Sequence, residues 1–201
     1  MASAVDICNL ALSRLGDTAT VSSIDPPEGS VQAEHCARFY PVSRDSLLEA
    51  YDWKFSTRWG TIARLDLSHP GWRIVYAVPN DMIRVIAVLP PGAVPGAASV
   101  NYAVETSAKG DLVILSNQDK ASIHYTTRVT DTSKFSPLFV DALAWLLASN
   151  LAGPLIKGDA GAKMGQSCYQ FAQATISQAK VSDANQPHDR QDHVPAWIKA
   201  R

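Results

Sequence analysis

The sequence predicts an α+β fold in which helices from both ends of the chain form a bundle and an antiparallel β-sheet is inserted between them. Helical periodicity dominates up to Tyr51, apolar and polar residues alternate between Trp72 and Val129, and helical periodicity returns after Asp131. We therefore expect a discontinuous helical domain (residues 1–56 and 132–184), a β domain (57–131) and a flexible C-terminal tail (185–201).

The first expected helix covers residues 3–16. Ser3 and Asp6 have the spacing of a capping box, with Asp in place of the usual Glu, and Gly16 is typical of a helix end. Its apolar residues follow one helical face: Ala4, Cys8, Ala11, Leu12 and Leu15.

A second helical pattern runs from about residue 28 to residue 51. Pro41 interrupts it, and because proline removes a backbone donor we expect a kink there or a split into two helices. The apolar positions recur at intervals of three and four: Ala33, Cys36, Ala37, Tyr40, Leu47, Leu48 and Tyr51.

Four segments alternate as half-buried strands do: residues 82–89, 99–106, 112–116 and 121–129. Short turns rich in Asn, Asp and Gly lie between them, at residues 78–81, 109–111 and 117–119. Short links favour antiparallel pairing of neighbouring strands, so we expect a meander, with a projecting Pro- and Gly-rich loop at 90–95.

The helix expected after Ser136 is apolar on almost every side. Ser136 suits the N-cap, Pro137 the first turn and Gly153 the C-cap, and Pro154 should prevent continuation. Such a helix must be covered by other helices or by other copies of the chain. The residues expected in this core or subunit contact are Leu138, Phe139, Leu143, Trp145, Leu146 and Leu147. A membrane span is disfavoured because about 25 Å of helix would carry Asp141 and Asn150 into hydrocarbon.

A last amphipathic helix is expected over residues 159–181. Its packed face should hold Met164, Cys168, Phe171, Ala172, Ile176 and Ala179. After the polar stretch 183–193, an apolar cluster of Val194, Pro195, Trp197 and Ile198 suggests a docking peptide on a tether. The alternative is that Trp197 folds back onto its own bundle.

Composition and motifs give no support for an enzyme. The net charge of −1 argues against an electrostatic nucleic-acid binder, although a locally basic surface would still allow it. Cys8, Cys36 and Cys168 are far apart in apolar helical patterns and are expected to be buried thiols. We recognise no catalytic, cofactor-binding or metal-ligand pattern, and we read Trp53, Trp59 and Trp72 as packing aromatics. The N-terminus shows no targeting signal, so we expect synthesis and assembly in the cytoplasm.

Several short blocks, taken together in order and spacing, resemble the tail tubular protein A family of short-tailed phages. The resemblance covers roughly residues 5–170. The blocks are Ile7-Cys8-Asn9-Leu10-Ala11-Leu12-Ser13-Arg14-Leu15-Gly16, Phe39-Tyr40-Pro41, Arg44-Asp45-Ser46-Leu47-Leu48, Trp53-Lys54-Phe55, Tyr76-Ala77-Val78-Pro79-Asn80-Asp81-Met82-Ile83-Arg84, Asp131, Phe135-Ser136-Pro137-Leu138-Phe139 and Ala142-Leu143.

The resemblance implies a structural virion protein, the head-to-tail adaptor. Such adaptors form a dodecameric ring beneath the portal protein, extend the channel for double-stranded DNA and present the surface on which the tail nozzle protein assembles. In relatives the C-terminal segment docks on the portal. It further implies no enzymatic activity and a place at the head-tail junction of the virion. From the residues themselves we expect no cofactor and no membrane partner. Another phage structural or scaffold component, a nucleic-acid-binding protein and a small enzyme stay open as alternatives.

Overall fold

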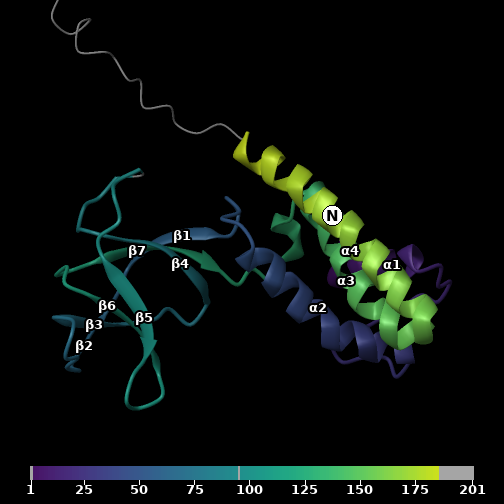
Figure 1. The fold of residues 1–201 in the computed structure, drawn as a ribbon, viewed down its shortest axis with the longest axis horizontal. Helices are drawn as coiled ribbons and strands as arrows, with labels where there is room; N and C mark the ends of the chain where they lie inside the picture. Colours follow the sequence, from purple (N-terminus) through teal and green to yellow (C-terminus); the bar gives the residue numbers. More distant parts are fainter. Residues whose placement is uncertain (1, 95, 186–201) are drawn as a thin grey trace, which may run out of the picture.

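The computed structural model describes residues 2–94 and 96–185, and these form two lobes that lie side by side (Figure 1). The helical lobe contains α1 (Ala4–Arg14), α2 (Val31–Glu49), α3 (Pro137–Ile156) and α4 (Gly158–Ala184). A short 3-10 helix, Thr132–Lys134, leads back into it from the β lobe. The α+β prediction is confirmed.

The centre of the helical lobe is α3, which contacts α1, α2 and α4. Phe139, Leu143, Leu147 and Leu151 of α3 are fully buried, as an apolar helix wrapped by three others requires. The helix starts agree with the sequence signals. Ser3 and Asp6 form the capping box of α1, and Ser136 accepts a hydrogen bond from the Phe139 amide at the start of α3.

The two prolines predicted to interrupt helices lie inside them. The alternative that Pro41 splits the second pattern is wrong, because α2 runs as one helix through it. The predicted stop of α3 at Gly153 and Pro154 is also wrong, since α3 continues to Ile156. Pro154 removes the amide that would bond to the carbonyl of Asn150, but Asn150 is exposed, so that carbonyl has access to water.

Helices α3 and α4 are joined at Lys157 alone, and two glycines of α4 let them approach closely. Lys157 has φ 62°, which turns the chain back on itself. A Cβ at Gly161 would lie 2.9 Å from the Ala152 carbonyl oxygen, and one at Gly165 would lie 3.1 Å from the Ser149 carbonyl oxygen. Both glycines are therefore required by helix packing.

The predicted packed face of α4 is partly wrong. Cys168, Ala172, Ile176 and Ala179 are buried as expected, but Met164 and Phe171 are exposed. The buried stripe instead takes in Gly161, Thr175 and Asp183. It is shifted around the helix toward small residues, because these fit against α3 at short distance.

The β lobe consists of two antiparallel sheets. Its strands are β1 (Thr57–Thr61), β2 (Arg64–Leu65), β3 (Ile74–Ala77), β4 (Met82–Leu89), β5 (Tyr102–Thr106), β6 (Leu112–Ser116) and β7 (Ser122–Thr127). One sheet has the order β1-β7-β4 and the other β2-β3-β6-β5. The antiparallel prediction is confirmed, but a meander is wrong, because β4 pairs with β7 rather than with β3 or β5.

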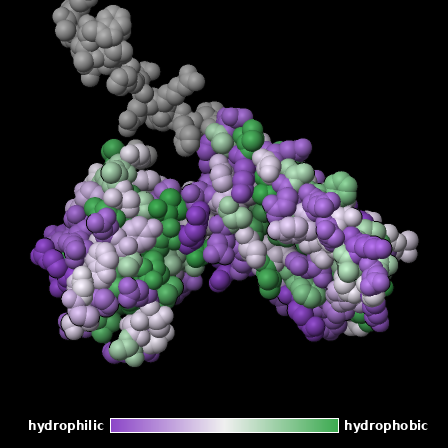
Figure 2. Space-filling view, viewed as in Figure 1, coloured by the Kyte–Doolittle hydropathy of each residue, from purple (hydrophilic) through white to green (hydrophobic). Residues whose placement is uncertain are grey.

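The core between the sheets includes Tyr76, Val88, Ile114 and Ile123. A second, smaller cluster on β3 and β6 contains Val75, Val113 and Leu115. In the space-filling view the lobes are distinct masses separated by a notch (Figure 2). The joint between them thus decides how each lobe is presented.

Candidate assembly surfaces and the joint between the lobes

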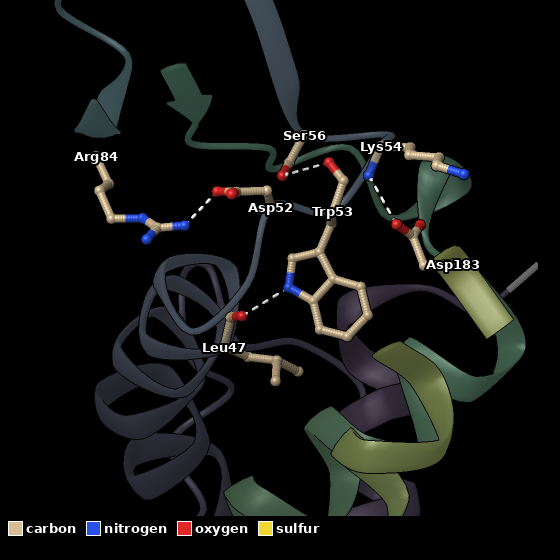
Figure 3. A network of polar contacts seen from close by, with 7 residues as sticks. All are labelled: Leu47, Asp52, Trp53, Lys54, Ser56, Arg84 and Asp183. Carbon is tan, nitrogen blue, oxygen red and sulfur yellow. Dashed lines mark hydrogen bonds and ion pairs between the residues drawn. The ribbon is translucent and has the colours of Figure 1, made fainter. Parts of the chain in front are cut away.

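Trp53 lies at the centre of the joint, just after α2 (Figure 3). Its side chain is 1% exposed, and its ring meets Phe139 edge to face with centroids 5.1 Å apart. The indole Nε1–H donates a hydrogen bond of 2.8 Å to the carbonyl of Leu47. The Leu47 carbonyl is one of the last four carbonyls of α2, which have no donor within the helix. Trp53 therefore supplies a hydrogen bond to the end of the helix while its ring fills the core.

Ion pairs tie the helical lobe to the β lobe on either side of Trp53. Arg84 of β4 pairs with Asp52, which follows α2. Arg128, which follows β7, donates from Nε to Asp45 of α2 at 2.8 Å. The second carboxylate oxygen of Asp45 accepts from the largely buried Arg44.

Backbone groups complete the joint. Asp183 of α4 accepts a hydrogen bond of 3.2 Å from the Lys54 amide (Figure 3), so the end of α4 is bound to the segment entering β1. The Thr127 amide donates to the carbonyl of Ser56 at 2.7 Å, which joins the two chain segments that cross between the lobes. These contacts hold the lobes in one relative orientation.

The notch between the lobes is bordered by both of them. A hollow of about 350 Å³ there is lined by Val42, Asp45, Ser46, Glu49, Met82, Ile83 and Arg128. Val42 is 60% exposed. The lining thus combines apolar with charged side chains, as surfaces that contact other proteins do.

The residues predicted for the core or subunit contact of α3 separate into two sets. Phe139, Leu143 and Leu147 are fully buried within the protomer, whereas Leu138, Trp145 and Leu146 are only partly buried. The second set is available at the surface of the helical lobe. The other predicted contact residues, Val194, Pro195, Trp197 and Ile198, lie outside the described residues.

Trp145 belongs to a surface cluster contributed by three helices. Its ring stacks on Phe171 of α4 with centroids 4.9 Å apart, and the guanidinium of Arg14 lies 4.1 Å from its centroid. Arg14 also pairs with Asp141 at 2.5 Å. Phe171 is 56% exposed, so the cluster presents an aromatic surface next to a fixed ion pair.

The β lobe has one hollow of larger size, about 470 Å³, against the outer face of the four-stranded sheet. Val75, Val113 and Leu115 line its base, while the His69 and Glu105 side chains, 3.5 Å apart, lie at its edge. No third acidic, cysteine or histidine ligand joins them among the described residues. The lining is mixed in polarity, since Ser68, Thr106, Ser107 and Lys109 also border the hollow.

The tryptophans predicted to be packing aromatics differ in burial. Trp53 is in the helical core and Trp72 packs on the smaller β cluster, but Trp59 is 45% exposed and stacks on His124 at 4.6 Å. Burial lowers the pKa of His124. The neutral ring is favoured there.

The three cysteines are buried and free, as predicted. A hydrogen bond with Cys36, together with burial, raises the pKa of the Cys8 thiol, so this thiol stays protonated and is a poor nucleophile. Within the described part of the chain, no group of three or more His, Cys, Asp or Glu residues could hold a metal ion.

Among the described residues, α3 is the helix whose length and composition would allow it to cross a membrane, and 44% of its most apolar window is buried inside the protein. Core helices of soluble proteins meet the same criteria, so this is weak evidence for a span.

No family model matches the chain, and no curated protein matches it significantly.

Sequence reasoning missed the charged residues of the joint, namely Asp45, Asp52, Arg84, Arg128 and Asp183. Each pairs with a partner distant in the chain, which no local spacing indicates. A signal was available for Asp183, since an acidic residue in register with the apolar stripe of α4 indicates a buried partner.

Proposed function

We propose that this protein is a structural component of a phage virion, a head-to-tail adaptor that joins the portal protein to the tail nozzle protein. One observation carries the proposal. The sequence blocks that resemble the tail tubular protein A family, although scattered along the chain, supply much of the joint between the lobes.

The block around Trp53 provides the buried indole and Phe55, and the block ending at Arg84 provides the ion pair to Asp52. The block around Asp45 provides the pair to Arg128, and the block ending at Phe139 provides the ring that meets Trp53. A likeness that includes residues joining the two lobes supports a shared architecture. A connector requires such rigidity, because it must present one surface to the portal and another to the tail.

The ring is proposed to be dodecameric and to surround the DNA channel at the head-tail junction. The net charge of −1 supports passage of duplex DNA without tight binding, since a dense basic surface would retain the phosphate backbone. No cofactor or catalytic step is needed for this role.

Mixing the purified protein with its cognate portal protein tests the proposal. Native mass spectrometry is expected to show a complex with multiple copies of both proteins, and negative-stain images are expected to show rings. Absence of any complex between the two proteins would refute the adaptor function. Tight binding of free duplex at physiological salt, with a steep salt dependence, would instead favour a DNA-binding protein.

A further inference from the structure

Two of the three cysteines form a pair in the core of the helical lobe. Cys8 lies on α1 and Cys36 on α2, and neither side chain is exposed to solvent. Their thiols are hydrogen-bonded to each other. Two helices therefore bring their sulfur atoms into contact inside one apolar cluster.

The surroundings of the pair agree with this contact. Tyr40 lies one turn after Cys36 on α2 and is buried. Burial raises its pKa to about 12, and Cys8 of α1 acts in the same direction, so Cys8 lies close to this part of α2. Among residues 2–94 and 96–185, no third His, Cys, Asp or Glu joins the two thiols to complete a tetrahedral metal site. Oxidation is thus the chemistry open to the pair.

We propose that Cys8 and Cys36 are a reversible redox pair, which a peroxide converts into a disulfide that joins α1 to α2. This inference goes beyond the proposed function and does not depend on it. The disulfide would close residues 9–35 into a loop and fix α1, which packs mainly on α3, to a second helix. Reducing conditions favour the dithiol and oxidising conditions the disulfide.

The two thiols differ in reactivity, which assigns their roles. The hydrogen bond with Cys8 lowers the pKa of Cys36, whereas the same bond, together with burial, raises the pKa of Cys8. The thiolate is the form that attacks an oxidant. Cys36 therefore reacts first, and Cys8 is the resolving thiol.

Hydrogen peroxide supplies the two-electron oxidant. The Cys36 thiolate attacks one peroxide oxygen, so that the S–O bond forms, the O–O bond breaks, and the departing hydroxide takes up a proton to give water. Cys36 is then a sulfenic acid. The Cys8 sulfur attacks the Cys36 sulfur, so that the S–S bond forms, the S–O bond breaks, and the hydroxide leaves as water with the proton from Cys8. The thiols lose two electrons in total, and the peroxide is reduced to two molecules of water.

Cys168 of α4 provides an internal comparison. It is buried like the other two cysteines, and burial raises its pKa, but the neighbour that acts on it is Arg14 rather than a thiol. Without a resolving thiol it should remain unpaired. Because all three sulfur atoms are buried, oxidation must proceed through local opening of the core and should be slow.

Trypsin separates the three cysteines for the test, because cleavage after Arg14, Arg38 and Lys163 leaves each in its own peptide. The folded protein is treated with hydrogen peroxide, unfolded in the presence of iodoacetamide, digested and studied by mass spectrometry. We expect the peptide that ends at Arg14 to be linked to the peptide that ends at Arg38, and Cys168 to be alkylated. The oxidised protein should melt about 5–10 °C higher, and dithiothreitol should reverse the rise.

Single serine variants control for other effects of the oxidant. Cys8→Ser and Cys36→Ser should show no rise in melting temperature with peroxide, whereas Cys168→Ser should behave as the wild type. Alkylation of all three cysteines after peroxide treatment of the wild type would overturn the proposal. A disulfide that contains Cys168, or Cys36 oxidised to sulfinic acid beside a free Cys8, would overturn it as well.

Discussion

Replacement of Trp53 perturbs packing and hydrogen bonding at the joint at once. The side chain is 1% exposed and contacts the rings of Tyr51, Phe55 and Phe139. Its Nε1–H is bonded to the Leu47 carbonyl at the end of α2. In Trp53→Ala the core loses a large aromatic group and α2 loses the donor that satisfies its terminus.

The magnitudes of the two effects add to a large share of the stability of a domain. Truncation of a buried aromatic residue costs about 3–5 kcal/mol, and a buried carbonyl left without a donor costs about 1–3 kcal/mol. Domains of ordinary size have unfolding free energies of about 5–15 kcal/mol. Trp53→Ala is therefore expected to leave the helical lobe barely stable. Trp53→Phe keeps most of the apolar area but removes the donor, so we expect a loss of about 1–3 kcal/mol.

Urea unfolding followed by far-UV circular dichroism measures these differences without relying on tryptophan fluorescence. Trp59→Ala is the matched control, because Trp59 is 45% exposed and stacks on a single neighbour, His124. Its cost should be below about 1 kcal/mol. Equal unfolding midpoints for Trp53→Phe and the wild type, or equal losses for Trp53→Ala and Trp59→Ala, would refute the assignment of Trp53 as the centre of the joint.

Three other changes test separate features. Asn9→Ala removes a side chain that bonds both to the carbonyl and to the amide of Val21, so the unfolding free energy in urea should fall by about 1–3 kcal/mol. Gly161→Ala should lower the melting temperature by crowding α3, whereas Gly153→Ala, which has open space, should raise it through helix propensity. Because burial lowers the pKa of His124, its contribution to stability is complete above the unfolded pKa of about 6.5 and is lost as the pH falls through the lower folded pKa. His124→Gln should therefore reduce the drop in melting temperature between about pH 7.5 and about pH 5. An unchanged unfolding free energy for Asn9→Ala would contradict the hydrogen-bonding argument. Melting temperatures of Gly161→Ala and Gly153→Ala that shift in the same direction would contradict the packing argument. An undiminished pH effect in His124→Gln would contradict the titration argument.

Features that depend on neighbouring residues were predicted well. The capping box of α1 and the N-cap of α3 follow from short spacings, and β4 and β6 begin and end where alternation predicts. Sheet order was not predicted, because it depends on pairings such as β1 with β7 that join residues distant in the chain. Strands β1, β2 and β3 were missed. Thr57–Thr61 contains Gly60 and has no regular alternation, β2 has two residues, and Ile74–Ala77 is a continuous apolar run.

Contacts at the joint also connect residues distant in the chain, so local sequence patterns did not predict them. The sequence predicted that Trp53 is a packing residue, because tryptophans in a soluble domain are usually buried, but it did not predict the rings that Trp53 contacts. The ion pairs of Asp52 with Arg84 and of Asp45 with Arg128 could not be anticipated, because exposed and paired charges look alike in one sequence. A charge becomes informative only when the fold shows which opposite charge it meets.

The error on α4 has a physical cause that bears on assembly. Helical periodicity places Met164 and Phe171 close to Cys168 and Ala172, and hydrophobicity alone assigns all of them to one packed face. Close approach of α3 and α4 selects among them by size, because Gly161 and Gly165 leave no room for large side chains at the contact. The small residues are therefore buried, and the large ones are displaced to the flank of the helix. An apolar stripe wider than its own fold can bury leaves its large members exposed, as Met164 and Phe171 are on α4.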